Sequence, residues 1–215
     1  MSTAPAFEPR RARHLVVDDF LSAEVADAML AQMITAGPHF APSRIGNDGT
    51  GRLDTDYRSS LRLPKSAGVD KSPLVDAIHA RIDAFCADLG LSSFTICRTE
   101  TSVVSHRDGD FYKRHVDTRI GVSDAPSVRV VSCVYYLHRV PAGFSGGELA
   151  IHPLIGNADP ILVAPLHNRL AVFPSFVPHE VLPIRAAGGF AESRFSVNCW
   201  LHRATDLGPA RGDSA

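Results

Sequence analysis

The chain has 215 residues, a formal net charge of −1 and ten histidines. Apolar residues make up 45% and charged residues 21%, shares that exclude a disordered, collagenous or coiled-coil protein. The near-neutral charge argues against a nucleic-acid partner, because a general nucleic-acid-binding protein needs a basic face for phosphate. The large number of histidines is a first hint of metal or acid–base chemistry.

The sequence has no apolar stretch of signal-peptide length at its start and no run long enough to span a membrane. We therefore expect a cytoplasmic protein without a membrane partner. The cysteines lie far apart and form no C-x-x-C pair, so neither a zinc knuckle nor a disulfide framework is expected. Apolar or aromatic neighbours predict that all four are buried. They are Cys86, Cys97, Cys133 and Cys199.

Two amphipathic segments predict helices before residue 92. Residues 14–20 are typical of a short strand, and Ser22 is a good N-cap for a helix over about residues 23–36 that Gly37-Pro38 stops. A second helix is expected to begin at Ser72-Pro73 and to end at Gly90. Its apolar face comprises Leu74, Ile78, Ile82 and Phe85. The intervening segments predict a long loop at 41–56 and a strand at 57–63.

Short β-rich runs separated by turn residues follow residue 92. They are 94–105, 111–118, 128–138, 147–152, 161–164, 169–174, 179–184 and 193–201. Strands at this spacing without intervening helices are typical of a sandwich or jelly roll. The expected fold class is mainly β with N-terminal helices. We expect one domain over residues 1–205, helical over about 14–90 and a jelly roll over about 92–202, with a flexible tail at 206–215.

Two His-x-Asp pairs are candidates for metal ligands. His115 and Asp117 lie in a strand-like run, where residues two apart point to the same face and can hold one ion together. His106 and Asp108 lie in a turn-like stretch, where side-chain directions are less fixed. The residue pattern therefore favours His115 and Asp117.

His179 is the best candidate for a third ligand, because it follows a proline and begins a predicted strand. Two histidines and one carboxylate on one face of a metal form the facial triad of non-haem Fe(II) oxygenases. A Zn-dependent hydrolase can use the same ligands. It would also need a catalytic base, and the sequence has no H-E-x-x-H motif.

The predicted strand at 193–201 has two different faces. Its period of two places Phe195, Val197, Cys199 and Leu201 on one face, and Arg194, Ser196, Asn198 and Trp200 on the other. An arginine that points into a sandwich is costly unless an anion meets it. A bidentate carboxylate ligand would satisfy Arg194, and an ion pair at the rim is the alternative.

The order and separation of several short motifs resemble a 2-oxoglutarate/Fe(II) dioxygenase of the prolyl-4-hydroxylase-like group. The resemblance covers about residues 100–202. Its motifs are Tyr112-Lys113-Arg114-His115-Val116-Asp117, Cys133-Val134-Tyr135-Tyr136-Leu137, Gly146-Gly147-Glu148-Leu149, Pro178-His179-Glu180-Val181, and Arg194-Phe195-Ser196 with Trp200. The family's fold is a double-stranded β-helix, a jelly roll that carries N-terminal helices.

The resemblance implies Fe(II) as cofactor, with 2-oxoglutarate and O2 as cosubstrates, and admits ascorbate as an additional reductant. It makes His115, Asp117 and His179 the iron ligands and the catalytic centre. Arg194 would bind the distal carboxylate of 2-oxoglutarate, with Ser196 and Tyr136 beside it.

Two features depart from the family pattern. Similar prolyl hydroxylases often have a tyrosine about ten residues before the first iron ligand, where this chain has Ser105 or His106. The turn before Arg194 is also long, which leaves Arg185 as the alternative contact for the anion.

The expected reaction is hydroxylation of an unactivated C–H on a prolyl or other amino-acid-type substrate, either a small molecule or a peptide. Residue candidates for substrate binding are Tyr112, Arg119, Arg58 and Trp200. Several basic residues near the expected mouth favour a substrate with a carboxylate. The alternatives are a small-molecule biosynthetic oxygenase, a non-catalytic jelly-roll binding module and a Zn-dependent hydrolase.

Overall fold

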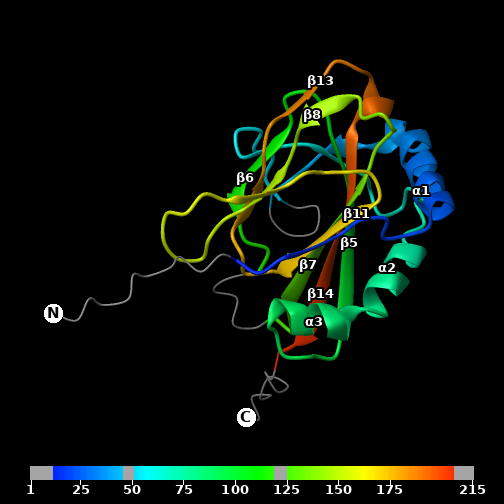
Figure 1. The fold of residues 1–215 in the computed structure, drawn as a ribbon. Coiled ribbons are helices and arrows are strands. Elements are labelled where there is room, and N and C mark those ends of the chain that lie inside the picture. The colour runs from blue at the N-terminus through cyan, green and yellow to red at the C-terminus, as the bar shows by residue number, and fades with distance from the viewer. Residues whose placement is uncertain (1–11, 46–50, 119–124, 206–215) are drawn as a thin grey trace, which may run out of the picture.

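The computed structural model of the protein describes residues 12–45, 51–118 and 125–205 (Figure 1). Most of these residues lie in or between strands, and the described α-helices all precede residue 90. The α-helices are α1 (Ala23–Thr35), α2 (Ser72–His79) and α3 (Ile82–Leu89). The short 3-10 helices are η1 (Gly37–His39) and η2 (Phe190–Glu192). Within the described residues, none of the helices is long and apolar enough to cross a membrane.

Strand pairing produces a large and a small antiparallel sheet. The large sheet has the order β1 (Leu15–Val17), β11 (Arg169–Pro174), β7 (Ser127–Leu137), β14 (Arg194–Ala204), β5 (Arg98–His106), β4 (Leu61–Arg62) and β2 (Ala41–Pro42). The small sheet has the order β10 (Ile161–Val163), β9 (Leu149–Ile151), β12 (His179–Val181), β6 (Phe111–His115) and β3 (Arg58–Ser59). A hairpin of β8 (Phe144–Gly146) and β13 (Ile184–Ala186) stands beside them.

The two faces of the large sheet have different partners. One face packs against α1, α2 and α3 in the larger hydrophobic core, with the helices gathered on one side of β5, β7 and β14 (Figure 1). A smaller core, which includes Tyr136, Leu149 and Phe173, joins residues of β7, β9 and β11 from the two sheets. Residues from strands of both sheets also line a cavity between the sheets, among them His179 of β12 and Ser196 of β14.

The alternating pattern of β14 is confirmed. Phe195, Val197, Cys199 and Leu201 all lie in the core beneath the helices. Arg194, Ser196, Asn198 and Trp200 all line a cavity on the opposite face. Strand periodicity alone is sufficient for this result, because successive side chains of a strand point to opposite faces.

The N-terminal part departs from the sequence predictions in two places. The predicted second helix is two helices, because the backbone leaves the α-helical region at Arg81, whose φ is −113°. The predicted apolar face is nevertheless confirmed across both helices, because its four residues are all buried. They are Leu74, Ile78, Ile82 and Phe85. The predicted strand at 57–63 is also two strands, β3 and β4, which pair with different sheets.

Smaller corrections concern the other predicted segments. The expected loop at 41–56 contains β2, and the hairpin of β8 and β13 was not expected. Cys97 is exposed, so the prediction that all four cysteines are buried is wrong at this position. It precedes β5 at the end of the sheet, where its backbone pairs with His202 but few side chains cover it. The predicted tail at 206–215 lies outside the described residues.

Candidate active site

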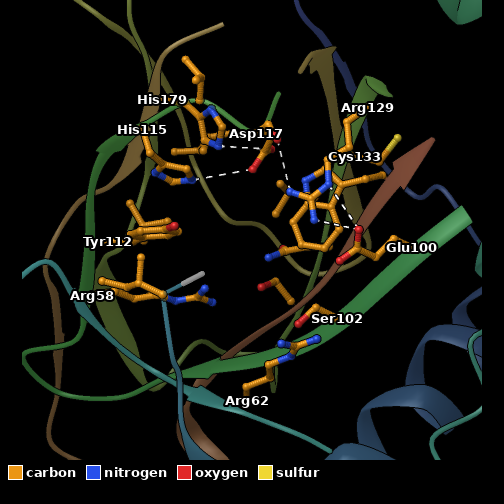
Figure 2. A pocket seen from close by; sticks show the side chains of 18 of the residues that line it. Arg58, Arg62, Glu100, Ser102, Tyr112, His115, Asp117, Arg129, Cys133 and His179 are labelled. Atoms are coloured by element: carbon orange, nitrogen blue, oxygen red, sulfur yellow. Dashed lines mark hydrogen bonds and ion pairs between the residues drawn. The ribbon is translucent and has the colours of Figure 1, made fainter. Parts of the chain in front are cut away.

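Two histidines meet across the small sheet. His115 is the last residue of β6 and His179 is the first residue of β12, and the two are direct partners in the strand register. Asp117 follows two residues after His115, beyond the end of the strand. One ligand atom from each of these residues lies within 4.8 Å of the others, an arrangement that could hold a metal ion (Figure 2). The structure therefore brings the predicted triad together.

Hydrogen bonds to the backbone fix the orientation of both imidazole rings. Nδ1 of His115 lies 2.8 Å from the carbonyl oxygen of Lys113, and Nδ1 of His179 lies 2.9 Å from that of Val177. A carbonyl oxygen only accepts, so each Nδ1 carries the proton and each Nε2 presents a lone pair. Burial and the neighbouring His179 lower the pKa of His115 to about 3. Both conditions favour the neutral imidazole that binds a metal.

The carboxylate of Asp117 is held by the large sheet. Its Oδ2 accepts a hydrogen bond of 2.7 Å from Ser132 Oγ on β7, and its backbone N–H donates to the carbonyl of Ser175. Oδ1 lies 3.8 Å from His115 Nε2, and Oδ2 lies 3.5 Å from His179 Nε2. Burial would raise the pKa of Asp117, but the two histidines and Ser132 lower it. The aspartate is thus positioned as an ionised ligand, even though the strand predicted over 111–118 ends at His115.

Arg194 is a buried cation without a carboxylate partner among the described residues. Its side chain is 1% exposed, and its Nε and Nη2 have no hydrogen-bond partner. Its guanidinium carbon lies 4.7 Å from the centre of the Tyr136 ring, and Nη1 lies 3.2 Å from His106 Nδ1. Burying a charge in this way is costly, so the arrangement is suited to an anionic ligand.

His106 occupies the position opposite Arg194 in the strand register. Burial and the charge of Arg194 hold the pKa of His106 well below its usual range, so the ring is neutral. Because the guanidinium can only donate, Nδ1 of His106 accepts and its proton sits on Nε2. That Nε2 and the hydroxyl group of Tyr136 are buried without a hydrogen-bond partner among the described residues. A ligand that accepts hydrogen bonds would fit these groups.

A cavity of about 510 Å³ connects the triad to Arg194. The predicted residues Tyr112, Arg58, Ser196 and Trp200 line it as well. Tyr136 lies beneath the Arg194 guanidinium rather than in the cavity wall. Arg185 is exposed on β13 and does not line the cavity. Arg119 lies outside the described residues.

Sequence reasoning missed an ion pair in the pocket wall. Glu100 of β5 accepts a hydrogen bond of 2.7 Å from Arg129 of β7, whose guanidinium carbon lies 4.2 Å from the centre of the Trp200 ring. Strand alternation could have found Glu100, because it shares a face of β5 with Ser102 and His106. Arg129 carries no such signal, since its position depends on the pairing of distant strands.

Residues 101–202 match the family model of the 2OG-Fe(II) oxygenase superfamily. An uncharacterized PKHD-type hydroxylase of Synechocystis sp. is 26% identical over 196 residues, which cover 87% of this chain and 62% of the relative. The chain thus spans less than two thirds of that relative. Over residues 101–202 the chain is similar to the 2OG-Fe(II) oxygenase superfamily. Members of this superfamily use Fe(II), 2-oxoglutarate and O2.

Two solved structures show the same fold at low sequence identity. A prolyl-4-hydroxylase of Pseudomonas putida has a TM-score of 0.62 and 24% identity, with 90% of this chain and 94% of that chain covered. A prolyl hydroxylase of Trichoplax adhaerens, solved with a peptide fragment of hypoxia inducible factor, has a TM-score of 0.61 and 19% identity. That match covers 87% of this chain and 82% of the other.

Proposed function

We propose that the protein is an Fe(II)- and 2-oxoglutarate-dependent hydroxylase. The observation that carries the proposal is one cavity that contains both a His-Asp-His cluster and a buried arginine without a carboxylate partner among the described residues. The first set of groups suits a divalent metal with open coordination positions, and the second suits a dicarboxylate cosubstrate.

Each group of residues has a defined task in this proposal. His115, Asp117 and His179 would hold Fe(II) through their two Nε2 atoms and the carboxylate. Arg194, Ser196 and Tyr136 bind the distal carboxylate of 2-oxoglutarate, and His106 donates to it from Nε2. When bound, iron and 2-oxoglutarate activate O2 for oxidation of a C–H bond and yield succinate and CO2. The protein's own residues orient the substrate and exclude water.

We also propose that the two sheets form the double-stranded β-helix of this family and that the helices belong to the same domain. The shared core of the helices and the large sheet supports one domain, because neither layer buries its apolar face without the other. The pairing order of the small sheet, in which β9, β12 and β6 are neighbours, supports a jelly roll.

The proposed substrate is a prolyl or other amino-acid-type compound. The prolyl hydroxylases among the structural neighbours support this class, and one of them was solved with a peptide.

Cosubstrate turnover tests the proposal against its alternatives. Purified protein is reconstituted without oxygen with either Fe(II) or Zn(II), and succinate is measured after O2 and 2-oxoglutarate are added. We expect succinate with Fe(II) and none with Zn(II). Absence of succinate with either metal, across a panel of amino acids and prolyl peptides, would favour a non-catalytic binding module. Activity with Zn(II) alone would favour a hydrolase.

A further inference from the structure

Two short strands bring a pair of arginines into the active-site cavity. Arg58 lies on β3 of the small sheet and Arg62 lies on β4 of the large sheet, on either side of the buried Ser60. Both line the cavity that holds the His115, Asp117 and His179 cluster. In Figure 2 their guanidinium groups extend into the same space, on the side of Tyr112 away from that cluster.

Neither arginine has an ion-pair partner in the part of the chain that the structure describes. Arg58 donates from Nε to Ser60 Oγ at 3.0 Å, and no carboxylate meets its other nitrogens within the described residues. Burial lowers the pKa of Arg58, and the charge of Arg62 lowers it further. Arg129, in contrast, is neutralised by Glu100 beside it in the cavity wall. Arg58 and Arg62 are therefore two neighbouring positive charges without compensation in this wall.

A stack of side chains connects Arg58 to the metal cluster. The Tyr112 ring lies 3.7 Å from the His115 ring at an interplanar angle of 22°, and the guanidinium carbon of Arg58 lies 4.5 Å from the centre of the Tyr112 ring. An anion held by Arg58 is thus one aromatic ring away from a proposed iron ligand. A group attached to that anion can extend toward the metal.

Arg194 and Arg58 contact different residues. The neighbours of Arg194 are His106 and Tyr136, whereas Arg58 contacts Ser60 and Tyr112. One dicarboxylate at Arg194 would leave the charge of Arg58 and Arg62 without a partner. The cavity therefore offers two cationic positions, and the proposed cosubstrate accounts for one.

We infer that Arg58 and Arg62 bind a carboxylate of the substrate, so that the enzyme acts on a carboxylic acid. The inference rests on the proposed function and narrows its substrate class. A pair of guanidinium groups suits a carboxylate because their N–H donors match its two oxygens. The carboxylate belongs either to a free amino acid or to an acidic peptide. A second cavity of about 340 Å³, which shares Arg44 and Arg62 with the first, gives a peptide room to continue.

The single tryptophan of the chain, Trp200, provides a direct binding signal because it lines the same cavity. The protein is loaded with Fe(II) and 2-oxoglutarate without oxygen, and Trp200 emission is followed during titration. The probes are the twenty L-amino acids, their primary amides, and proline-containing hexapeptides with either two Glu or two Gln residues. We expect a free acid or a Glu peptide to bind at least about tenfold more tightly than its amide or Gln counterpart. Free amino acids and peptides identify the two sources separately.

Neutral variants test the two arginines themselves. Arg58→Gln and Arg62→Gln should each weaken binding of the preferred acid by roughly tenfold to a hundredfold and leave binding of its amide unchanged. Affinity for 2-oxoglutarate should stay within about twofold, as measured by isothermal titration. Arg58→Lys should retain part of the acid preference, because it keeps the charge but not the paired donors. Arg185→Gln removes an exposed arginine outside the cavity and serves as the matched control.

Three results would overturn the inference while the proposed function stands. In the first, the wild-type protein binds 2-oxoglutarate but prefers no acid over its amide. In the second, none of the acids binds. In the third, the Gln variants lose affinity for 2-oxoglutarate instead of the acid. Failure of the wild-type protein to bind 2-oxoglutarate with Fe(II) would instead refute the proposed function.

Discussion

Replacement of Arg194 by methionine should stabilise the protein in the absence of 2-oxoglutarate and destroy its response to that compound. The wild-type guanidinium is 1% exposed, and two of its nitrogens have no hydrogen-bond partner. Burial lowers the pKa of Arg194, because desolvation disfavours the charged form of the side chain. Methionine is similar in length to the aliphatic part of arginine and carries no charge.

The expected change follows from two opposing contributions. Replacing a buried ion pair by apolar side chains of similar volume is neutral or stabilises a protein by about 1–4 kcal/mol, and the same desolvation cost applies to the unpaired charge of Arg194. Loss of the guanidinium over the Tyr136 ring costs about 0.5–2 kcal/mol. The midpoints of the two ranges give a net stabilisation of about 1 kcal/mol, or roughly 2–4 °C in Tm for a chain of this size. Saturation with 2-oxoglutarate at one hundred times its Kd adds about 2.7 kcal/mol to the wild type alone.

Thermal unfolding of both proteins, with Fe(II) and without oxygen, measures this change in a buffer free of carboxylates. Each protein is heated with and without 2-oxoglutarate, and the exposed Arg185→Met variant serves as the control. The variant at Arg194 should have the higher Tm alone and the lower Tm with 2-oxoglutarate. A variant that is less stable than the wild type without 2-oxoglutarate would refute the buried-charge argument. A variant that 2-oxoglutarate still stabilises would refute the proposed binding site.

Three further predictions concern other residues. Asp117→Ala should lower Fe(II) affinity and succinate formation at least about a hundredfold, whereas Asp108→Ala, in the other His-x-Asp pair, should match the wild type in both assays. For His106, the folded protein keeps the ring neutral while the unfolded chain takes up a proton below the ordinary histidine pKa of about 6.5, so stability falls as pH decreases. His106→Gln should remove about 2 kcal/mol of the loss between pH 7 and pH 5 in urea unfolding, and an unchanged pH dependence would contradict this. Gly147→Ala places a methyl group 2.6 Å from Ile184 Cγ1 and 3.0 Å from Arg194 Cδ at a φ of +72°, so it should cost about 1–3 kcal/mol. Displacement of Arg194 should also weaken 2-oxoglutarate binding in calorimetry, and normal binding would argue against a role for this contact.

Local sequence patterns were sufficient to predict features that lie within a single strand or helix. The two faces of β14 follow from alternation alone, and the structure confirms them from Phe195 to Trp200. The start of β12 at His179 follows from the preceding proline. Helix α1 begins after Ser22, whose Oγ accepts the N–H of Val25 as an N-cap.

The pairing of distant strands positions the three candidate ligands, and this pairing could not be predicted from the sequence. His115 and His179 are cross-strand partners, and their sequence separation gives no indication of that register. Asp117 lies beside the two histidines because hydrogen bonds with Ser132 and Ser175 position it, and not because β6 continues to this residue. The alternation of side chains within a predicted strand therefore identified the candidate ligands. The hydrogen bonds that position these ligands could be found only in the tertiary structure.

The charged residues show the same limit. A single strand over 57–63 would place Arg58 and Arg62 on the same face, but the pattern does not indicate that the two residues lie in different sheets. The break at Ser60 sends the chain from the small sheet to the large sheet and brings both side chains to one wall. The register of Arg194 with Ser196 and Trp200 favours Arg194 over Arg185 as the anion contact, and in the structure Arg194 is buried in the cavity whereas Arg185 is exposed.

A crystal structure grown without oxygen, with Fe(II) and 2-oxoglutarate bound, tests the central claim most directly. We predict that iron is coordinated by Nε2 of His115, Nε2 of His179 and the carboxylate of Asp117, with the distal carboxylate of 2-oxoglutarate on Arg194. Iron at other ligands, or a distal carboxylate on Arg185 or on Arg58, would contradict the account.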